Sequence, residues 1–400
     1  MIDRILNNQL CLGCGLCQSA FGKDTCEMVL SETGFYQPRT KRAFSKEEEK
    51  KLQRLCPGVH VEAQAHKGVW GSMLSIADAW SSDENIRFRA ASGGVITSLA
   101  IYLLETHQVD AILQVGVCND SYLYNELKVS HTRDEVMKNA QSRYAPALFF
   151  SEIKHLFDTT NETFALVGKP CDMAAMQNFC REYKEYDGRI SYYLSIFCAG
   201  MPSYLATEQT WRLSGHRDTP IRLKYRGDGW PGNFKAEFTD GSNFQLSYNE
   251  SWGKILGKSV GFRCKICPDG IGLLADISVG DSWNTKDGYP DFTESKGRCF
   301  CMIRTQRGAH LFDEAMNAGY IEVNHLDVSR IKEMQAYQYR RRQLVGWRLL
   351  PVQILNDFIL NFKGLGTFSL ALKANYRRGI SELLGSFKRL RRLRKELNGK

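Results

Sequence analysis

Apolar segments of two kinds alternate through residues 66–335 of this 400-residue chain. Short runs rich in β-branched and aromatic residues are typical of buried strands, and longer runs with apolar residues three and four apart are typical of helices. We therefore expect α/β layers packed around a mixed sheet. The expected strands cover residues 109–117, 164–168 and 190–197, and the expected helices cover residues 95–105, 142–157 and 171–179.

The flanking regions have a different character. From residue 221 the segments shorten and become rich in glycine, and Asp240-Gly241 separates two alternating runs, which predicts a β-hairpin. Residues 1–65 carry cysteines and little regular periodicity, apart from a polar helix expected just before Cys56. Residues 337–400 have the pattern of basic, amphipathic helices.

Charge separates this last segment from the rest of the chain. The net charge is +9, yet residues 337–400 hold 15 Lys and Arg against 3 Asp and Glu, and the remainder holds 38 against 41. Leu390, Leu393 and Leu397 fall on one helical face with arginines around them. Such a helix can lie on an anionic membrane or bind an acidic partner, or it can simply pack its leucines on the body. It lacks an aromatic platform or a recognised module for nucleic acid, which argues against that partner.

The thirteen cysteines require an explanation in a chain of this size. The first ten residues lack the apolar run of a signal peptide, and no apolar stretch approaches the ~20 residues that a membrane span needs. We expect a cytoplasmic protein, with peripheral contact at the inner membrane surface through the basic tail as an open alternative. Thiols stay reduced in the cytosol, so clustered cysteines there indicate metal or redox chemistry.

The run Cys11-Leu-Gly-Cys14-Gly-Leu-Cys17 has the spacing by which three thiolates converge on one 4Fe–4S cluster. In two-cluster ferredoxins a fourth cysteine, followed by proline, comes four residues later and serves the other cluster; here that position is Phe21. Cys56-Pro57 is therefore expected to supply the fourth ligand, with Cys26 as its competitor. The alternative is a structural zinc site, although zinc sites usually pair two separated cysteine knuckles.

These observations define an expected architecture. We predict an α/β fold, more fully an α+β mixed-sheet core in residues 66–335, with an N-terminal ferredoxin-like cluster segment in residues 1–65 and a C-terminal helical basic tail in residues 336–400.

Two further features carry candidate chemistry. Ser92-Gly93-Gly94 precedes the expected apolar helix, with Ser92 as a candidate N-cap, and free amides at a helix start bind phosphate. By itself this stretch favours a capped core helix over a phosphate site. A second cysteine set lies where strands end or loops begin and has the look of another cluster site: Cys171, Cys198, Cys264 and Cys267. We interpret Cys118, Cys180, Cys299 and Cys301 as core or incidental residues.

Taken in order, these stretches resemble the beta subunits of coenzyme F420 hydrogenases and dehydrogenases, and the related plant 7-hydroxymethyl chlorophyll a reductase. The matching stretches cover about three-quarters of the chain. They are Cys11–Cys17, AASGGVITSL, Gln141–Tyr144, VGKPCDMAAMQNF, FCAGMPSY, YRGDGWPG and RCKICPDGIGLLADISVGDSW. The chain departs from the family where Lys169-Pro-Cys-Asp replaces the more usual Thr-Pro-Cys-Gln, and the basic tail lies outside the family core.

The resemblance implies an FAD- and iron–sulfur-dependent oxidoreductase that passes electrons between two 4Fe–4S clusters and FAD, with ferredoxin or another redox protein as partner. The substrate would be a deazaflavin or another small organic molecule. The alternative is a non-catalytic electron-transfer subunit of a larger complex. The resemblance assigns the second cysteine set to the flavin-proximal cluster, and it assigns to FAD binding Ser92, Gly93, Gly94, Val95, Thr97, Ser142, Arg143, Tyr144, Asp276 and Asp281. For Asp276 and Asp281, loop capping is an equal alternative. His131, His155 and Arg226 are candidates for action at the substrate, although a single histidine is more often structural or exposed.

Overall fold

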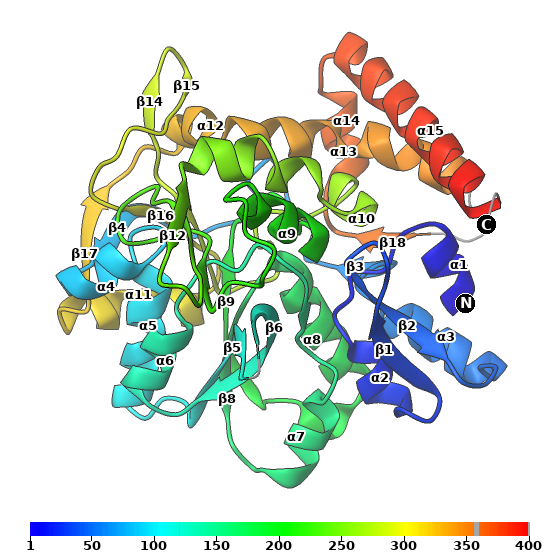
Figure 1. The fold of residues 1–400 in the computed structure, drawn as a ribbon, viewed down its shortest axis with the longest axis horizontal. Coiled ribbons are helices and arrows are strands. Elements are labelled where there is room, and N and C mark those ends of the chain that lie inside the picture. The colour runs from blue at the N-terminus through cyan, green and yellow to red at the C-terminus, as the bar shows by residue number, and fades with distance from the viewer. Residues whose placement is uncertain (120, 356–359, 399–400) are drawn as a thin grey trace.

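The computed structural model describes residues 1–119, 121–355 and 360–398, and a nine-stranded mixed sheet forms its centre (Figure 1). Its four central strands run parallel, the three strands on one side of them pair antiparallel, and on the other side β6 pairs antiparallel with β5 and parallel with β7. This arrangement confirms the expected mixed α/β class. The order across the sheet is β17 (Ile321–His325), β4 (Ser75–Ser81), β16 (Cys299–Ile303), β13 (Ile277–Asp281), β9 (Ile190–Ile196), β8 (Phe164–Gly168), β5 (Ala111–Cys118), β6 (Ser121–Ser130) and β7 (Ala147–Leu148).

Helices cover both faces of this sheet. Along β8, Phe164 and Leu166 belong to one apolar core and Ala165 belongs to another, because successive side chains of a strand point to opposite faces. The first core packs against α7 (Ile153–Thr159) and α8 (Pro170–Glu182). The second packs against α5 (Val95–Glu105), α6 (Arg133–Asn139) and α11 (Gln306–Asn317). Buried strands with both faces covered explain the nearly continuous apolar runs in the sequence.

The two ends of the chain share a core of their own. Apolar side chains of α1 (Ile2–Asn7) and α3 (Lys46–Leu55) pack with those of α13 (Ala336–Leu355) and α15 (Tyr376–Asn398). In addition, β3 (His60–Glu62) pairs in parallel with β18 (Asn361–Lys363). The boundaries at residues 65 and 335 stay predictions, but the segments beyond them form one packed unit beside the sheet (Figure 1).

The tail is helical, as the sequence predicts, and its leucines lie on the body. Leu390 is buried and Leu393 is partly buried in the core that the two chain ends share, while the side chain of Leu397 lies outside the described residues. An ion pair between Arg348 of α13 and Glu382 of α15 fastens the two helices at 2.9 Å. No helix in the described part of the chain is both long and apolar enough to cross a membrane.

Most of the expected elements are confirmed. The strand over 164–168 and the helix over 95–105 match β8 and α5, and β11 (Phe234–Glu237) pairs with β12 (Asn243–Leu246) as the predicted hairpin. The capping box of Ser45 and Glu48 begins the predicted polar helix α3.

The expectation of one helix over residues 142–157 is wrong. Residues 140–146 form a loop, residues 147–148 pair with β6, and only α7 is helical. Pro146 lacks an amide hydrogen and disfavours the helical region for the residue before it. The side chain of Asn125 donates to the Pro146 carbonyl at 3.1 Å, and Arg143 donates to the Tyr122 carbonyl at 2.7 Å, so tertiary contacts hold the loop open.

The N-cap of α5 also differs from the expectation. The cap is Gly94 in the left-handed conformation, with φ 78°, and not Ser92. Ser92 lies two residues earlier, where its hydroxyl donates to the Arg298 carbonyl at 3.3 Å and contacts the Cys299 thiol at 3.2 Å. The glycine therefore turns the chain into the helix, and Ser92 joins that turn to β16.

Candidate functional site

Four thiols line one hollow beside the N-terminal segment. They are Cys11, Cys14, Cys17 and Cys56, and the rest of the lining is almost entirely apolar. Cys26 is not among the lining residues, although its side chain contacts Cys17. The geometry therefore favours Cys56 over Cys26 as the fourth member of the set.

Glycines shape the loop that carries these thiols. Gly13 and Gly15 have φ values of 67° and 85°, and a Cβ on Gly15 would lie 2.8 Å from the amide nitrogen of Ser151. The Gly13 amide donates to the Cys11 sulfur at 3.3 Å. Only glycine lets the backbone turn this tightly and approach the sulfur atoms so closely.

The chemistry of this hollow suits a metal cluster. Burial, together with the neighbouring Cys56, raises the pKa of Cys11 to about 12. Four buried thiolates in an apolar pocket repel one another unless bound metal supplies positive charge. In the described part of the chain, no three His, Cys, Asp or Glu side chains converge as they do around a single metal ion.

The second cysteine set also comes together in space. Cys171 opens α8, Cys198 follows β9, and Cys264 lies in α10 (Phe262–Lys265) three residues before Cys267. All four line one hollow, although more than ninety residues separate the first from the last in sequence. Burial raises the pKa of Cys198 to about 12, and nearby Cys264 adds to this effect. Arg341 also lines this hollow, although the sequence indicated only that it contributes to the positive charge of the C-terminal tail.

A cavity of about 540 Å³ opens over the carboxyl ends of the central strands. This is the edge at which open α/β sheets bind ligands, and the size suits a cofactor. Eight of the ten residues assigned to flavin binding line it: Ser92, Gly94, Val95, Thr97, Ser142, Arg143, Tyr144 and Asp281.

The two other assigned residues lie outside the cavity lining. Gly93 packs against β16, and a Cβ there would lie 2.8 Å from the Cα of Arg298. Asp276 is 2% exposed and accepts hydrogen bonds from the Tyr193 amide and the Thr305 hydroxyl at 2.8 and 2.6 Å. Arg307 completes the contacts of this carboxylate at 2.9 Å. Asp276 thus has the loop-capping role that the sequence left open as an alternative to flavin binding. Its contacts connect the start of β13 to β9 and to α11.

Asp281 and Arg226 form a buried ion pair on the cavity wall. Both guanidinium nitrogens of Arg226 donate to the carboxylate at 3.1 Å, and the Trp230 indole nitrogen donates at 2.9 Å. Burial is the largest single effect and lowers the pKa of Arg226, but Asp281, Tyr144 and Tyr248 together outweigh it and raise the pKa well above its ordinary value. The guanidinium therefore stays charged, and the pair is positioned to orient a bound ligand.

The other two candidate side chains for substrate chemistry lie elsewhere. His131 is on the surface and contacts Glu162 at 2.9 Å, and His155 is exposed on α7. Of the four cysteines interpreted as core or incidental residues, Cys299 lines the cavity beneath Ser92, whereas Cys118, Cys180 and Cys301 do not.

Several lining residues escaped the sequence reasoning. Lys169 and Asp172 form an ion pair at 2.7 Å that lines both the inner thiol hollow and the cavity. The replacement of the usual threonine by Lys169 was the one signal in the sequence. Tyr248 and Trp252 add aromatic faces to the wall, and only the folding of distant segments brings them there.

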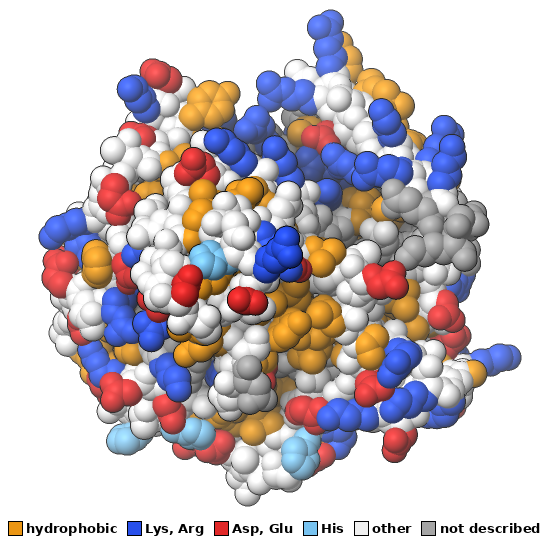
Figure 2. Space-filling view, in the orientation of Figure 1, with side chains coloured by type: hydrophobic (Ala, Val, Ile, Leu, Met, Phe, Trp, Pro, Cys, Tyr) orange, Lys and Arg blue, Asp and Glu red, His pale blue; other side chains and the backbone are white. Residues whose placement is uncertain are grey.

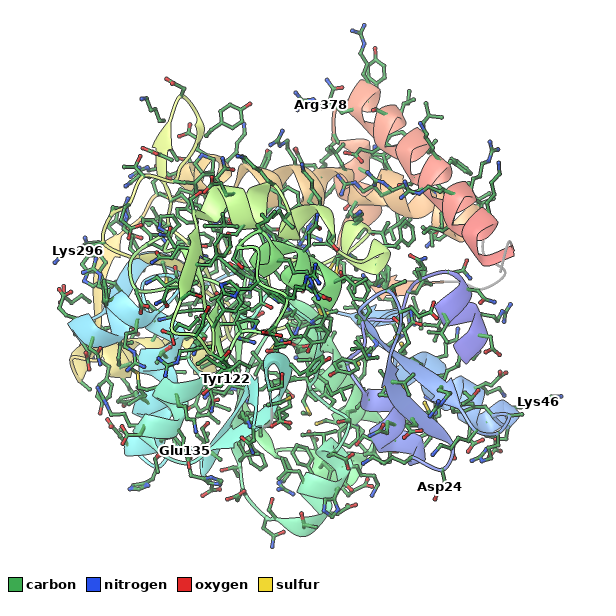
Figure 3. All side chains as sticks on the ribbon, viewed as in Figure 1. Asp24, Lys46, Tyr122, Glu135, Lys296 and Arg378 are labelled. Atoms are coloured by element: carbon green, nitrogen blue, oxygen red, sulfur yellow. The ribbon has the colours of Figure 1, made fainter. Side chains whose placement is uncertain are left out.

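The three spaces adjoin one another in a row. Cys14 and Leu12 line both the N-terminal hollow and the inner hollow. Cys198, Lys169 and Met201 line both the inner hollow and the large cavity. Figure 3 shows the dense packing of side chains through this part of the molecule. A group bound in each space would have the next one as its immediate neighbour.

Comparison with known proteins now bears on this arrangement. Two family models, both described as "Coenzyme F420 hydrogenase/dehydrogenase, beta subunit", match the chain. The model of the N-terminal part matches residues 76–154, and the model of the C-terminal part matches residues 161–329. This chain belongs to that family. Both matched regions contribute residues to the large cavity, and the second region contains the whole second cysteine set.

Known members of the coenzyme F420 hydrogenase/dehydrogenase beta subunit family are distant relatives. The coenzyme F420 hydrogenase subunit beta of Methanococcus voltae is 25% identical over 271 residues, which are 64% of this chain and 86% of that protein. The F420-dependent formate dehydrogenase subunit beta of Methanocaldococcus jannaschii is 25% identical over 61% of this chain and 60% of its own length. A chain in the structure of the F420-reducing [NiFe] hydrogenase complex from Methanosarcina barkeri shares the fold, with a TM-score of 0.54 and 20% identity over 71% of this chain and 94% of its own.

The residues present fit the cofactors that this family implies. Each thiol hollow offers four sulfur donors, and a buried Arg341 nitrogen beside the inner hollow has no partner in the described part of the chain. The cavity offers the first turn of α5, whose amide groups favour phosphate, and it offers aromatic faces for a flat ring system.

Proposed function

We propose that this chain is an iron–sulfur flavoprotein oxidoreductase that transfers electrons between two 4Fe–4S clusters and FAD, and so reduces or oxidises a small organic molecule. The observation that carries the proposal is the row of three adjoining spaces, two lined by four thiols each and one of cofactor size. When bound, the clusters supply one-electron storage and FAD supplies conversion between hydride and one-electron chemistry.

The protein's own residues have separate tasks in this proposal. Cys11, Cys14, Cys17 and Cys56 would hold the outer cluster, and Cys171, Cys198, Cys264 and Cys267 would hold the inner one. Gly94 turns the chain so that the start of α5 faces the cavity, where Ser92 and Thr97 lie at its lining.

Asp281 and Arg226, also on the cavity lining, form a fixed dipole that can orient the flavin ring or a substrate. Lys169 and Asp172 form an ion pair that lines both the cavity and the inner thiol hollow. A group bound in either space would therefore lie beside these charges.

Electron partners come next in this scheme. The hollow nearest the N-terminal segment is the one farthest along the row from the cavity, so a ferredoxin or another redox protein would exchange electrons there. The substrate would approach the cavity, and a deazaflavin is one candidate because relatives are named for coenzyme F420.

A second candidate is a non-catalytic electron-transfer subunit of a larger oxidoreductase complex. The names of the relatives as beta subunits favour it. Both candidates need the same cofactors, so cofactor content does not distinguish them.

The distinguishing experiment is turnover by the isolated chain. Protein purified without oxygen would be reduced chemically and offered a deazaflavin and a panel of quinones, enones and other small acceptors. Reoxidation at a catalytic rate with a small molecule supports the enzyme. Reoxidation only when a partner protein is added supports the electron-transfer role and contradicts the primary proposal.

A further inference from the structure

The outer face of α15 exposes a row of apolar side chains. Tyr376, Ile380 and Leu384 are four residues apart, so they share one side of the helix, and they are 61, 46 and 60% exposed. Leu372, at the end of α14 (Thr367–Leu372), precedes them by another four residues and is 84% exposed. Single exposed apolar residues are ordinary on a soluble protein, but a row of this kind marks a contact surface.

Basic residues continue and border this row. Three basic residues follow Leu384 along the helix at intervals of four, three and four positions: Lys388, Arg391 and Lys395. They lie on the same side of the helix as the apolar row, and all three are exposed. Figure 2 shows the hydrophobic side chains at the upper right flanked by Lys and Arg, and Figure 3 shows Arg378 at the outer end of α15. Among the described side chains of α15, Glu382 is the one acidic group, and Arg348 engages it on the inner side.

The fold itself does not use this face. The inner side of α15 carries the packing, through buried Leu390 and the contacts with α13. Exposing apolar residues on the outer side lowers solubility and gives nothing to the core. The face therefore has the composition of an interfacial helix, with an apolar strip for the acyl boundary and basic side chains for anionic headgroups.

We propose that the outer face of α15 docks the protein on an anionic lipid bilayer. The three apolar side chains would enter the boundary between headgroups and acyl chains, and Lys388, Arg391 and Lys395 would reach the lipid phosphates with their long stems. The described outward residues of α15 carry charge of a single sign and include no amide or acidic side chain. Such a face matches a surface of lipid phosphates better than it matches the mixed polar contacts of a protein interface.

The test is co-sedimentation of the full-length, cofactor-loaded protein with lipid vesicles. We expect binding to vesicles that contain phosphatidylglycerol, at least tenfold weaker binding to pure phosphatidylcholine, and loss of binding as salt rises. The double variant Ile380→Ser with Leu384→Ser, and separately Lys388→Glu with Arg391→Glu, should each weaken binding at least tenfold. Leu213→Ser is the matched control, since Leu213 is 60% exposed at the end of α9 (Tyr204–Arg212), and it should bind as the wild type does.

Two results would overturn the proposal. One is the absence of binding to anionic vesicles at moderate salt. The other is a stable dimer in light scattering that the Ile380→Ser and Leu384→Ser variant abolishes, because the face would then join two copies of the chain.

A separate observation concerns Arg341 of α13. It is 2% exposed, its Nη2 donates to the Cys198 carbonyl at 2.8 Å, and its Nε is buried without a partner in the described part of the chain. The guanidinium lies against the backbone at Gly270, where an added Cβ would fall 1.1 Å from Nη2. Its charge is therefore held beside the four inner thiols, in a place that only a glycine leaves open.

The neighbouring Arg342 is equally buried but differently used. Its donors reach the carbonyls of Val69, Pro268 and Leu365, together with the ring of His66. Arg342 thus joins three backbone segments, whereas Arg341 has a nitrogen left over at the inner hollow.

We infer that Arg341 raises the reduction potential of the cluster held by the inner thiols, an inference that rests on the proposed function. A reductant adds one electron and one negative charge to that cluster, and a fixed, buried positive charge stabilises the more negative state. The C-terminal tail, which lies outside the family core, therefore completes the inner redox site.

The test is an anaerobic redox titration of the cofactor-loaded protein, followed by electron paramagnetic resonance. Arg341→Gln keeps a donor for the Cys198 carbonyl but removes the charge, and we expect its reduction equilibrium constant to fall at least tenfold, which is 59 mV for one electron. Arg341→Lys should keep most of the wild-type potential, and Arg342→Gln should change it less than Arg341→Gln does.

The outcomes separate this inference from the proposed function. Absence of an inner cluster from the wild type would contradict the proposed function itself. A wild-type potential in Arg341→Gln with a full iron content would overturn the inference alone. Loss of the inner cluster from Arg341→Lys as well would also overturn it, because the role would then be structural.

Discussion

Asp276 and Asp281 lie five residues apart and provide a sharp test of the site. The family resemblance assigns both to the flavin, but only Asp281 lines the cavity. Asp276 instead accepts hydrogen bonds from Tyr193, Thr305 and Arg307 at the start of β13. We therefore expect Asp276→Ala to lower stability without changing FAD affinity.

The size of the effect follows from the contacts that Asp276→Ala removes. Leaving a buried donor unpaired costs about 1–3 kcal/mol, and Asp276→Ala removes the acceptor of the Tyr193 amide. Breaking a fully buried ion pair costs about 3–5 kcal/mol, but Arg307 is half exposed and can be rehydrated, so its share is smaller. A total of about 3 kcal/mol is reasonable, which lowers the melting temperature of a chain of this size by a few degrees.

The assay pairs two measurements on each variant. Thermal unfolding by circular dichroism at matched cofactor loading gives stability, and fluorescence titration of the flavin-depleted protein gives FAD affinity. Asp281→Asn is the counterpart, because it leaves Arg226 unpaired on the cavity wall, and we expect FAD binding to weaken at least tenfold, or about 1.4 kcal/mol. Undiminished stability of Asp276→Ala together with lost FAD binding would refute the reasoning and place Asp276 in the flavin site.

Three further predictions concern the cofactors. Cys56→Ser should reduce the iron content, measured by elemental analysis, from about eight to about four atoms per chain, whereas Cys26→Ser should keep the full iron content. Equal losses of iron in the two variants would return Cys26 to the ligand set. Gly94→Ala strains a left-handed residue by about 1 kcal/mol and places a Cβ 2.9 Å from Ile86, so the FAD occupancy measured by absorbance should fall. Gly188→Ala introduces the same backbone strain, but its Cβ would have no neighbour within 4 Å, so the FAD occupancy should not change. Gly58→Ala places a Cβ 2.4 Å from the Leu10 carbonyl and 3.2 Å from the Cys56 sulfur, so the outer cluster's resonance signal should disappear while the inner one persists.

The local sequence pattern predicted those helices and strands whose local conformational preference agrees with their tertiary contacts. The apolar runs of β8 and α5 and the Asp-Gly turn of the hairpin were correct because period and turn chemistry alone determine them. The helix expected over 142–157 failed because backbone contacts from Asn125 and Arg143 hold the stretch before Pro146 as a loop. Tertiary hydrogen bonds of this kind leave no periodic trace in the sequence.

The residues of the site divide in the same way, into those that local motifs predict and those that only the tertiary structure places. Motifs in the sequence grouped the two cysteine sets, and the structure places each set around one hollow, while their binding of clusters stays a prediction. The motifs did not separate Asp276 from Asp281, because both belong to the same short motif and only the register of β13 decides which side chain meets the cavity. Arg341 belongs to a run of three arginines that the sequence assigned only to the basic tail. Burial separates it and Arg342 from exposed Arg340, and of these three only Arg341 lines the inner hollow.

The most direct test of the account is the cofactor content of the full chain purified without oxygen. The account predicts about eight iron atoms, about eight acid-labile sulfides and one FAD per chain, with electron paramagnetic resonance signals from two interacting clusters after reduction. A colourless protein that contains zinc, with no iron and no flavin absorbance, would contradict it.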